Sequence, residues 1–192
     1  MTLTSICVYC GSSFGLLPEY KETAFAFGEL LASRRITLVY GGGNVGLMGA
    51  VADGALARGG KVIGVMPQLL VDKEVAHRGL TELHVVSSMH ERKTMMADLS
   101  DAFVALPGGN GTLEEIFEVY TWTQLGFHAK PCAFLDVAGF YQPLAAFLTG
   151  VAEQGFLKTE HLEMLMMETD MERLLQRFTA YEHRPVQKWI DR

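Results

Sequence analysis

Short apolar runs alternate along the chain with longer stretches in which apolar residues recur at helical spacing. The apolar runs predict strands at 5–10, 36–41, 61–66, 83–87, 102–106, 132–137 and 164–168. The periodic stretches predict helices at 18–33, 46–58, 89–99, 112–125, 141–154 and 170–181. We therefore expect an α/β fold: a single doubly wound, Rossmann-like domain over residues 1–192, with a mostly parallel sheet of about seven strands and helices on both faces.

Two segments depart from this alternation. Residues 67–82 carry several charged side chains, and we expect an ordered loop or a short helix there, near the ligand site. Residues 183–192 are expected to form a C-terminal tail over the surface, held there by Trp189. The sequence shows no internal repeat, low-complexity segment or interdomain linker, which agrees with one domain.

Glycine-rich turns follow three of the predicted strands, at 11–15, 41–46 and 107–112. In open α/β sheets, ligands bind beyond the carboxyl ends of the strands, near the point where the strand order reverses. Several turns that suit phosphate groups at one edge of the sheet indicate a ligand of nucleotide size.

The third turn is the most informative, because it joins the predicted strand 102–106 to a helix that begins with Thr112. Unpaired N–H groups at a helix start favour an anion, and glycine suits positions with positive φ or close ligand approach. Glu114 and Glu115 would place two carboxylates in the first turn, where they repel that anion. Such a conflict indicates a catalytic acid or base. The periodicity leaves the choice between them open, and the position relative to Thr112 slightly favours Glu115.

An arginine interrupts an apolar stripe on the preceding helix. Met89, Arg92, Met96 and Leu99 share one face of the predicted helix 89–99. An arginine there either extends past the seam to solvent or needs a charged partner. Because the helix starts just after a strand, we favour a guanidinium that points into the cleft and holds a carboxylate or a phosphate.

Two further motifs have simpler interpretations. Gly41, Gly43 and Gly46 match G-x-G-x-x-G, but the match follows the second strand and lacks the acidic residue that dinucleotide sites require. We interpret it as a wall of the ligand pocket. Cys7 and Cys10 form a C-x-x-C, but Cys7 lies within a strand and no second pair exists, so both are expected to be buried structural thiols. The histidine spacing indicates no metal site.

Composition limits the possible partners. A net charge of −6 argues against a general nucleic-acid binder. No apolar segment reaches the about 20 residues that a membrane span needs. The N-terminus lacks the basic region and long apolar core of a signal peptide, so the expected location is the cytoplasm.

The motifs taken together resemble the Lonely Guy family. The likeness rests on Pro-Gly-Gly-x-Gly-Thr-x-x-Glu at 107–115 and Met-His-x-Arg-Lys at 89–93. It extends through 10–13, 39–49 and 135–141. The family hydrolyses the N-glycosidic bond of cytokinin riboside 5′-monophosphates to a free base and ribose 5-phosphate. The resemblance implies a nucleoside 5′-monophosphate substrate, a homodimer and no cofactor.

Carried over to this sequence, the resemblance implies Arg92 and Glu115 as the catalytic pair, with Gly109 to Thr112 around the 5′-phosphate. The full set of implied substrate-binding residues is Ser12, Gly42, Gly43, Glu74, Met89, Lys93, Gly108, Gly109, Asn110, Gly111, Thr112, Leu113, Glu114 and Thr121. Asn110 stands where relatives often carry another residue, so it is not expected to be essential.

Two other functions compete with hydrolysis. Related domains with the same glycine turn bind nucleotides or molybdenum cofactor without catalysis, although pure binding would not require Arg92 together with Glu115. Family members are often labelled lysine decarboxylases, but that chemistry needs pyridoxal phosphate on a lysine, and Lys93 is the only lysine well placed. The sequence leaves the base open, because AMP and isopentenyl-type adenines are both compatible with the motifs.

Overall fold

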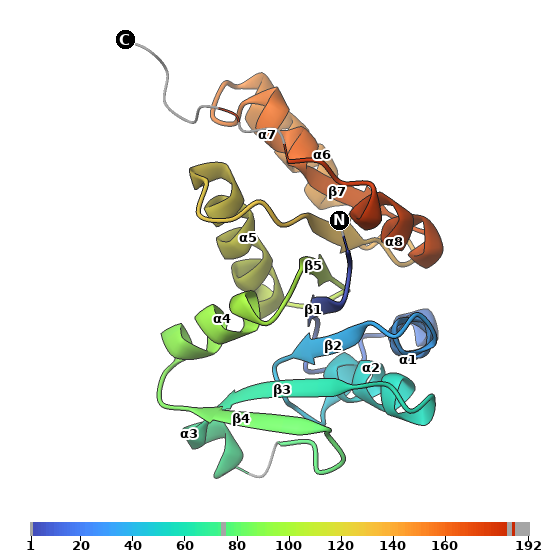
Figure 1. Ribbon diagram of the computed structural model, residues 1–192. Helices are drawn as coiled ribbons and strands as arrows, with labels where there is room; N and C mark the ends of the chain where they lie inside the picture. The colour runs from blue at the N-terminus through green and yellow to red at the C-terminus, as the bar shows by residue number, and fades with distance from the viewer. Residues whose placement is uncertain (1, 74–75, 184–185, 187–192) are drawn as a thin grey trace.

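The computed structural model describes residues 2–73, 76–183 and 186 of the 192-residue chain. Its centre is a seven-stranded sheet in the order β4-β3-β2-β1-β5-β6-β7, as Figure 1 shows. The strands are β1 (Ser5–Tyr9), β2 (Thr37–Tyr40), β3 (Val62–Pro67), β4 (Glu82–Val86), β5 (Ala102–Ala105), β6 (Cys132–Leu135) and β7 (Leu165–Glu168). All neighbouring strands are parallel, which confirms the predicted sheet. The order reverses between β1 and β5.

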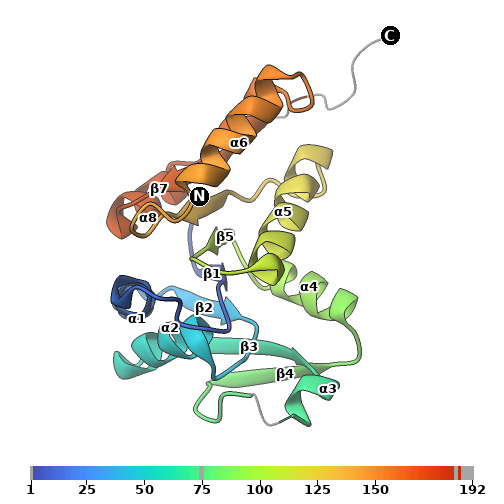
Figure 2. The same ribbon diagram turned by 180° about the vertical axis from the view of Figure 1, so that it is seen from behind.

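Helices cover both faces of this sheet. They are α1 (Pro18–Ser33), α2 (Gly46–Ala57), α3 (Gln68–Val71), α4 (Met89–Asp98), α5 (Asn110–Leu125), α6 (Gln142–Glu153), α7 (Thr159–Met164) and α8 (Met171–Thr179). One face carries α1, α2 and α8, whereas the other carries α4 to α7 (Figure 1 and Figure 2). The doubly wound arrangement is therefore confirmed. No helix in the described part of the chain combines the length and apolar character of a membrane span.

The sheet separates two apolar cores, because successive side chains of a strand point to opposite faces. Val8 of β1 packs with Phe27 of α1 on one side, whereas its neighbour Cys7 packs with Met96 of α4 and Ile116 of α5 on the other. Burying each large apolar side chain contributes about 1.5–3 kcal/mol to stability. These cores fix the carboxyl ends of β1, β2 and β5. The described cysteines are free and buried, as expected of structural thiols.

The structure corrects the predicted start of α5. The helix begins at Asn110 rather than Thr112, with Gly109 as its N-cap (φ −93°, ψ −155°). Glu114 and Glu115 therefore lie in the second turn and not in the first. The prediction failed because Asn110 and Gly111 are turn-forming residues that here adopt helical backbone.

Three other segments complete the comparison with the predicted elements. The polar helix α7 was not predicted, and the stretch 67–82 contains the short helix α3. Trp189 and most of the predicted tail 183–192 lie outside the described residues.

Candidate active site

Backbone hydrogen bonds tie the three glycine-rich turns together. The N–H of Gly11 donates to the carbonyl of Pro107, and the N–H of Leu47 donates to the carbonyl of Gly11, each at 3.0 Å. Gly46 has a left-handed φ of +56°, and a Cβ there would lie 2.3 Å from the Ser12 carbonyl carbon. The turns after β1, β2 and β5 therefore form one closely packed floor, which leaves no room for a side chain at Gly46.

A cavity of about 470 Å³ opens above this floor, at the carboxyl ends of β1, β2, β3 and β5. It is lined by Cys10, Gly11, Ser12, Gly41, Gly43, Val45, Met48, Met66, Leu70, Met89, Arg92, Gly109, Asn110, Gly111, Thr112, Glu114 and Glu115. Its volume is within the range of small-molecule sites. It lies where the strand order reverses, which is the position predicted for the ligand.

The start of α5 forms one side of the cavity and is suited to an anion. No side chain caps this helix, so the first N–H groups after Gly109 have no partner within the helix. Apart from its chain neighbours and the backbone of α5, a Cβ on Gly109 or Gly111 would meet no described heavy atom within 4 Å, and neither residue has a left-handed φ. The fold itself therefore does not require glycine at these two positions. Close approach of a ligand is the reason that remains.

The Arg92 guanidinium forms another side of the cavity. Its Nε donates to the carbonyl of Val65 at 3.2 Å, and its Nη1 lies 3.9 Å from the sulfur of Met89. Its Nη2 lies 3.7 Å from Oε1 of Glu115, and the two side chains are only 11% and 14% exposed. The guanidinium thus points into the cleft, as favoured from the sequence, and faces a carboxylate beyond hydrogen-bond distance.

The environment of Glu115 perturbs its acidity. Burial raises the pKa of this carboxyl, and the positive charge of Arg92 lowers it without cancelling the effect of burial. Within the described residues, no hydrogen bond to the Glu115 carboxylate occupies its acceptor positions. A poorly solvated carboxylate that faces a cavity can stabilise a developing positive charge or accept a proton from water.

Glu114 has a different environment, although it follows the same turn. Its side chain is 56% exposed and accepts a hydrogen bond from Lys93 Nζ at 2.7 Å. The same ammonium donates to Glu118 at 2.9 Å. Burial alone would lower the pKa of Lys93, but its hydrogen bonds to Glu114 and Glu118 outweigh that effect and raise the pKa. Lys93 therefore connects α4 to α5 as a charged ammonium.

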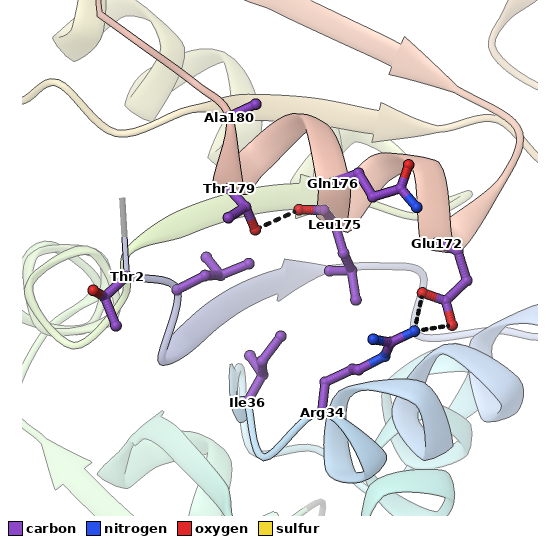
Figure 3. A pocket seen from close by; sticks show the side chains of 9 residues that line it. Thr2, Arg34, Ile36, Glu172, Leu175, Gln176, Thr179 and Ala180 are labelled. Atoms are coloured by element: carbon purple, nitrogen blue, oxygen red, sulfur yellow. Dashed lines mark hydrogen bonds and ion pairs between the residues drawn. The ribbon is translucent and has the colours of Figure 1, made fainter.

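A second hollow, of about 570 Å³, lies at the opposite, amino ends of the strands (Figure 3). There Arg34 Nη2 contacts both carboxylate oxygens of Glu172, at 2.7 and 2.6 Å. Its walls include Arg34, at the end of α1, and residues 172–180 along α8, and the one cation of the described lining, Arg34, is already paired with Glu172. This hollow lacks the features of an anion site that the cavity above β1 and β5 offers.

Comparison with known proteins identifies the family. Residues 48–178 match the family described as "Possible lysine decarboxylase". A probable cytokinin riboside 5′-monophosphate phosphoribohydrolase of Oryza sativa subsp. japonica is 47% identical over 92% of this chain and 78% of that protein. The phosphoribohydrolase of the same name from Rhodococcoides fascians is 46% identical over 89% of this chain and 87% of its own. The chain belongs to the Lonely Guy family.

Solved structures support the fold of this Lonely Guy protein. The molybdenum cofactor binding protein from Rippkaea orientalis has a TM-score of 0.70 at 22% identity, over 94% of this chain and 98% of that one. The molybdenum cofactor carrier protein of Chlamydomonas reinhardtii has a TM-score of 0.69 at 19% identity, over 94% and 100%. At such identities the likeness concerns the fold alone.

The cavity gathers most of the residues that the Lonely Guy motifs implied. Those that line it are Ser12, Gly43, Met89, Arg92, Gly109, Asn110, Gly111, Thr112, Glu114 and Glu115. The implied residues that lie outside its lining are Gly42, Lys93, Gly108, Leu113 and Thr121. Glu74 lies outside the described residues. Thr121, for example, donates its hydroxyl proton to the Phe117 carbonyl within α5.

Sequence reasoning did not name several residues that line the cavity. They are Cys10, Met48, Met66 and Leu70, whereas Gly41 was interpreted as part of a pocket wall and Gly11 and Val45 belong to the glycine-rich turns named from the sequence. Most of them lie at or just after the carboxyl end of β1, β2 or β3. Their position at the edge of the sheet where ligands bind was the signal that could have identified them. The described residues contain no cluster of histidine, cysteine or carboxylate side chains that could hold a metal ion.

Proposed function

We propose that this protein hydrolyses the N-glycosidic bond of nucleoside 5′-monophosphates, of the cytokinin type and including AMP, to a free base and ribose 5-phosphate. One observation carries the proposal: the anion-binding start of α5 and the buried Arg92–Glu115 pair line the same cavity. The activity printed in the names of relatives at 44–47% identity supports it.

Binding begins at the phosphate. The N–H groups from Asn110 to Thr112 and the positive end of the α5 dipole hold the 5′-phosphate, with Gly109 and Gly111 allowing close approach. This interaction is remote from the bond that breaks. It supplies binding energy that fixes the ribose beside Glu115.

The chemical step separates the base from the sugar. The bond between C1′ and the base nitrogen breaks, its electron pair leaves with the base, and an oxocarbenium-like centre develops on the ribose. The Glu115 carboxylate stabilises this positive charge or accepts a proton from the attacking water. The water oxygen bonds to C1′, and the proton that it releases balances the charge on the departing base. Arg92 opposes the effect of burial and so favours the ionised form of Glu115.

The same contacts argue against the two competing functions. A carrier has no use for a desolvated carboxylate beside an anion site, because Glu115 would repel the phosphate that the carrier binds. A lysine decarboxylase needs a neutral amine, but Lys93 is held as an ammonium by Glu114 and Glu118. Lys93 also lies outside the lining of the cavity.

We also propose that the protein is a homodimer, and the surface of α6 supports this part of the proposal. The helix is mostly apolar, yet Leu148 is its only buried residue and Phe147 is 68% exposed. An apolar helix surface of this kind is typical of an interface. Light scattering should give about twice the chain mass of 21.2 kDa, and Phe147→Glu should halve it.

A substrate panel tests the activity. Purified protein is incubated with AMP, with isopentenyladenosine 5′-monophosphate and with the matching nucleosides, and free base and ribose 5-phosphate are measured by chromatography. We expect release from the monophosphates and at least about tenfold less from the nucleosides, since they lack the group that α5 holds. The Glu115→Gln variant controls for contaminating hydrolases. Binding of the monophosphates without base release would favour a carrier instead.

A further inference from the structure

The position of the Arg92 guanidinium depends on a side chain that is absent. Gly41 follows β2 and lines the cavity. A Cβ at this position would lie 2.1 Å from Arg92 Nη2 and 3.3 Å from Arg92 Cζ. The next atom, the sulfur of Met48, is at an ordinary contact distance of 3.7 Å. The guanidinium therefore occupies the space that any other residue at position 41 would fill.

The backbone of Gly41 does not explain the glycine. Its φ is outside the left-handed region, whereas the next residue, Gly42, has a φ of +78°. Alanine at position 41 is therefore conformationally permitted. Its methyl group meets the end of a long side chain rather than backbone, so the fold can accept it if Arg92 moves.

Arg92 cannot yield without changing its relation to Glu115. The carbonyl of Val65 accepts from Nε on one side, and the sulfur of Met89 lies beside Nη1. The backbone of α4 is fixed at its start, where Ser88 Oγ accepts from the N–H of Glu91 at 3.1 Å. The nitrogen nearest to Gly41 is Nη2, which is also the nitrogen that faces Glu115.

We propose that Gly41 is a positioning residue for the hydrolysis: it leaves open the space in which the Arg92 guanidinium lies opposite Glu115. This inference rests on the proposed function for its kinetic consequences, but its structural consequence does not. Gly41 acts through Arg92. Displacement of the guanidinium moves a positive charge away from Glu115.

The charges around Glu115 determine in which direction its pKa changes when Arg92 is displaced. Arg92 and Lys93 on α4 lower the pKa of Glu115, whereas Glu114 and Glu118 on α5 raise it. From β1 and the turn after it, Cys7, Tyr9 and Cys10 also interact with Glu115, but burial raises the pKa of each, so they stay neutral near pH 7. When Arg92 moves away, the carboxyl of Glu115 therefore becomes harder to ionise.

The kinetic test compares Gly41→Ala with Gly150→Ala. Gly150 lies in α6, has no left-handed φ, and a Cβ there would meet no described atom within 4 Å. For Gly41→Ala we expect an unchanged fold, a kcat for AMP lower by about 10- to 100-fold, and a smaller change in KM. The acid limb of kcat/KM should move to higher pH. Kinetics and a pH profile like those of Gly150→Ala would overturn the inference.

A double-mutant cycle excludes a direct clash with the nucleotide. If Gly41 acts through Arg92, adding Gly41→Ala to Arg92→Ala should change neither the residual rate nor calorimetric AMP binding by more than about twofold. A full additional loss in that background would contradict the proposal, because the methyl group would then act on the substrate or on the fold.

A crystal structure of the Gly41→Ala variant separates this inference from the proposed function. We expect the Arg92 Nη2 to lie farther from Glu115 than the 3.7 Å of the native site. A guanidinium that stays in place beside the new methyl group would overturn the inference, whatever the protein hydrolyses. Absence of base release by the native protein would instead overturn the proposed function.

Discussion

Two neighbouring residues of α4, Lys93 and Arg92, form ion pairs with α5, and the tight contact of Lys93 differs from the loose contact of Arg92 in almost every respect. Lys93 is hydrogen-bonded to Glu114 at 2.7 Å and to Glu118 at 2.9 Å. Arg92 faces Glu115 at 3.7 Å without a hydrogen bond between them. Of the first group only Glu114 lines the cavity, whereas both members of the second line it. One residue along each helix thus separates the hydrogen-bonded contact of Lys93 from the contact of Arg92, which has no hydrogen bond to its carboxylate.

The difference shows how the helix packing prepares the site. The charged hydrogen bonds of Lys93 stabilise the packing of α4 against α5 and hold the two helices at a fixed separation. At that separation the Arg92 guanidinium and the Glu115 carboxylate remain apart, and their unused hydrogen-bonding positions face the cavity. The tight pair has a structural role, and the loose pair is available to substrate.

The largest expected effect on activity comes from removing the negative charge of Glu115. Glu115→Gln should lower base release from AMP by about 10²- to 10⁴-fold, because it removes the carboxylate that faces the ribose. AMP binding, measured by calorimetry, should persist. The matched variant Glu118→Gln keeps the same helix and changes a carboxylate outside the cavity lining, so its rate should stay within about fivefold of the native rate. Equal losses in the two variants would remove the distinction between the pairs.

Acidification should produce the next largest effect. Hydrolysis needs the ionised form of Glu115, and burial raises the pKa of this carboxyl despite Arg92. The rate kcat/KM should therefore fall as the pH drops through a value above the ordinary glutamate pKa of about 4.3, by about tenfold for each pH unit below it. Glu114 raises the pKa of Glu115, so Glu114→Gln should move this limb to lower pH. A limb at or below the ordinary value in the native protein would contradict the assignment.

A smaller effect is expected at the start of α5, where both ion pairs stay intact. Gly111→Ala places a methyl group where no described atom of the protein lies, but where the phosphate is held. KM for AMP should rise about tenfold, a loss of about 1.4 kcal/mol in binding. The free energy of unfolding should increase by about 0.5–1 kcal/mol, since alanine is the better helix former. Gly150→Ala should give the same stabilisation with an unchanged KM. If Gly111→Ala also left KM unchanged, the phosphate would bind somewhere other than the start of α5.

The contrast between these contacts also shows which features could be predicted from the sequence and which could not. Periodicity predicted the parallel sheet, the helices and the cleft at the strand ends, because buried strands and helix faces impose their spacing directly. It identified Arg92 as an anomaly, since a charge in an apolar stripe needs an explanation. It could not choose between Glu114 and Glu115, because both flank the apolar face of α5. That choice depends on which glutamate lies opposite Arg92 and which is bound by Lys93, a relation between helices.

Other features were beyond prediction for related reasons. The helix α7 is polar and short, so it carries no apolar period. The relation of Gly41 to Arg92 depends on two distant segments that meet only in the folded chain. Local patterns record what a residue does within its own element. They do not record which atom of another element fills the space beside it.

The smallest effect on catalysis, and a clear effect on stability, is expected from the tight pair. Lys93→Met removes the charge that Glu114 and Glu118 share, and Oε2 of Glu118 is already buried without a partner among the described residues. The free energy of unfolding should fall by about 1–3 kcal/mol in urea titrations. Lys61→Met, which removes an exposed pair with Glu82, should cost no more than about 1 kcal/mol. Base release should fall by less than about tenfold, since Lys93 lies outside the cavity lining.

The pH dependence of that stability difference completes the test. The folded state raises the pKa of Lys93, so its contribution is fully present below the unfolded value of about 10.4 and is lost as the pH rises through the folded value. The difference in unfolding free energy between the native protein and Lys93→Met should therefore narrow as the pH becomes strongly alkaline. If Lys93→Met instead abolished base release while leaving stability unchanged, the ammonium would act on the substrate. The tight pair would then share the role assigned here to Arg92 and Glu115.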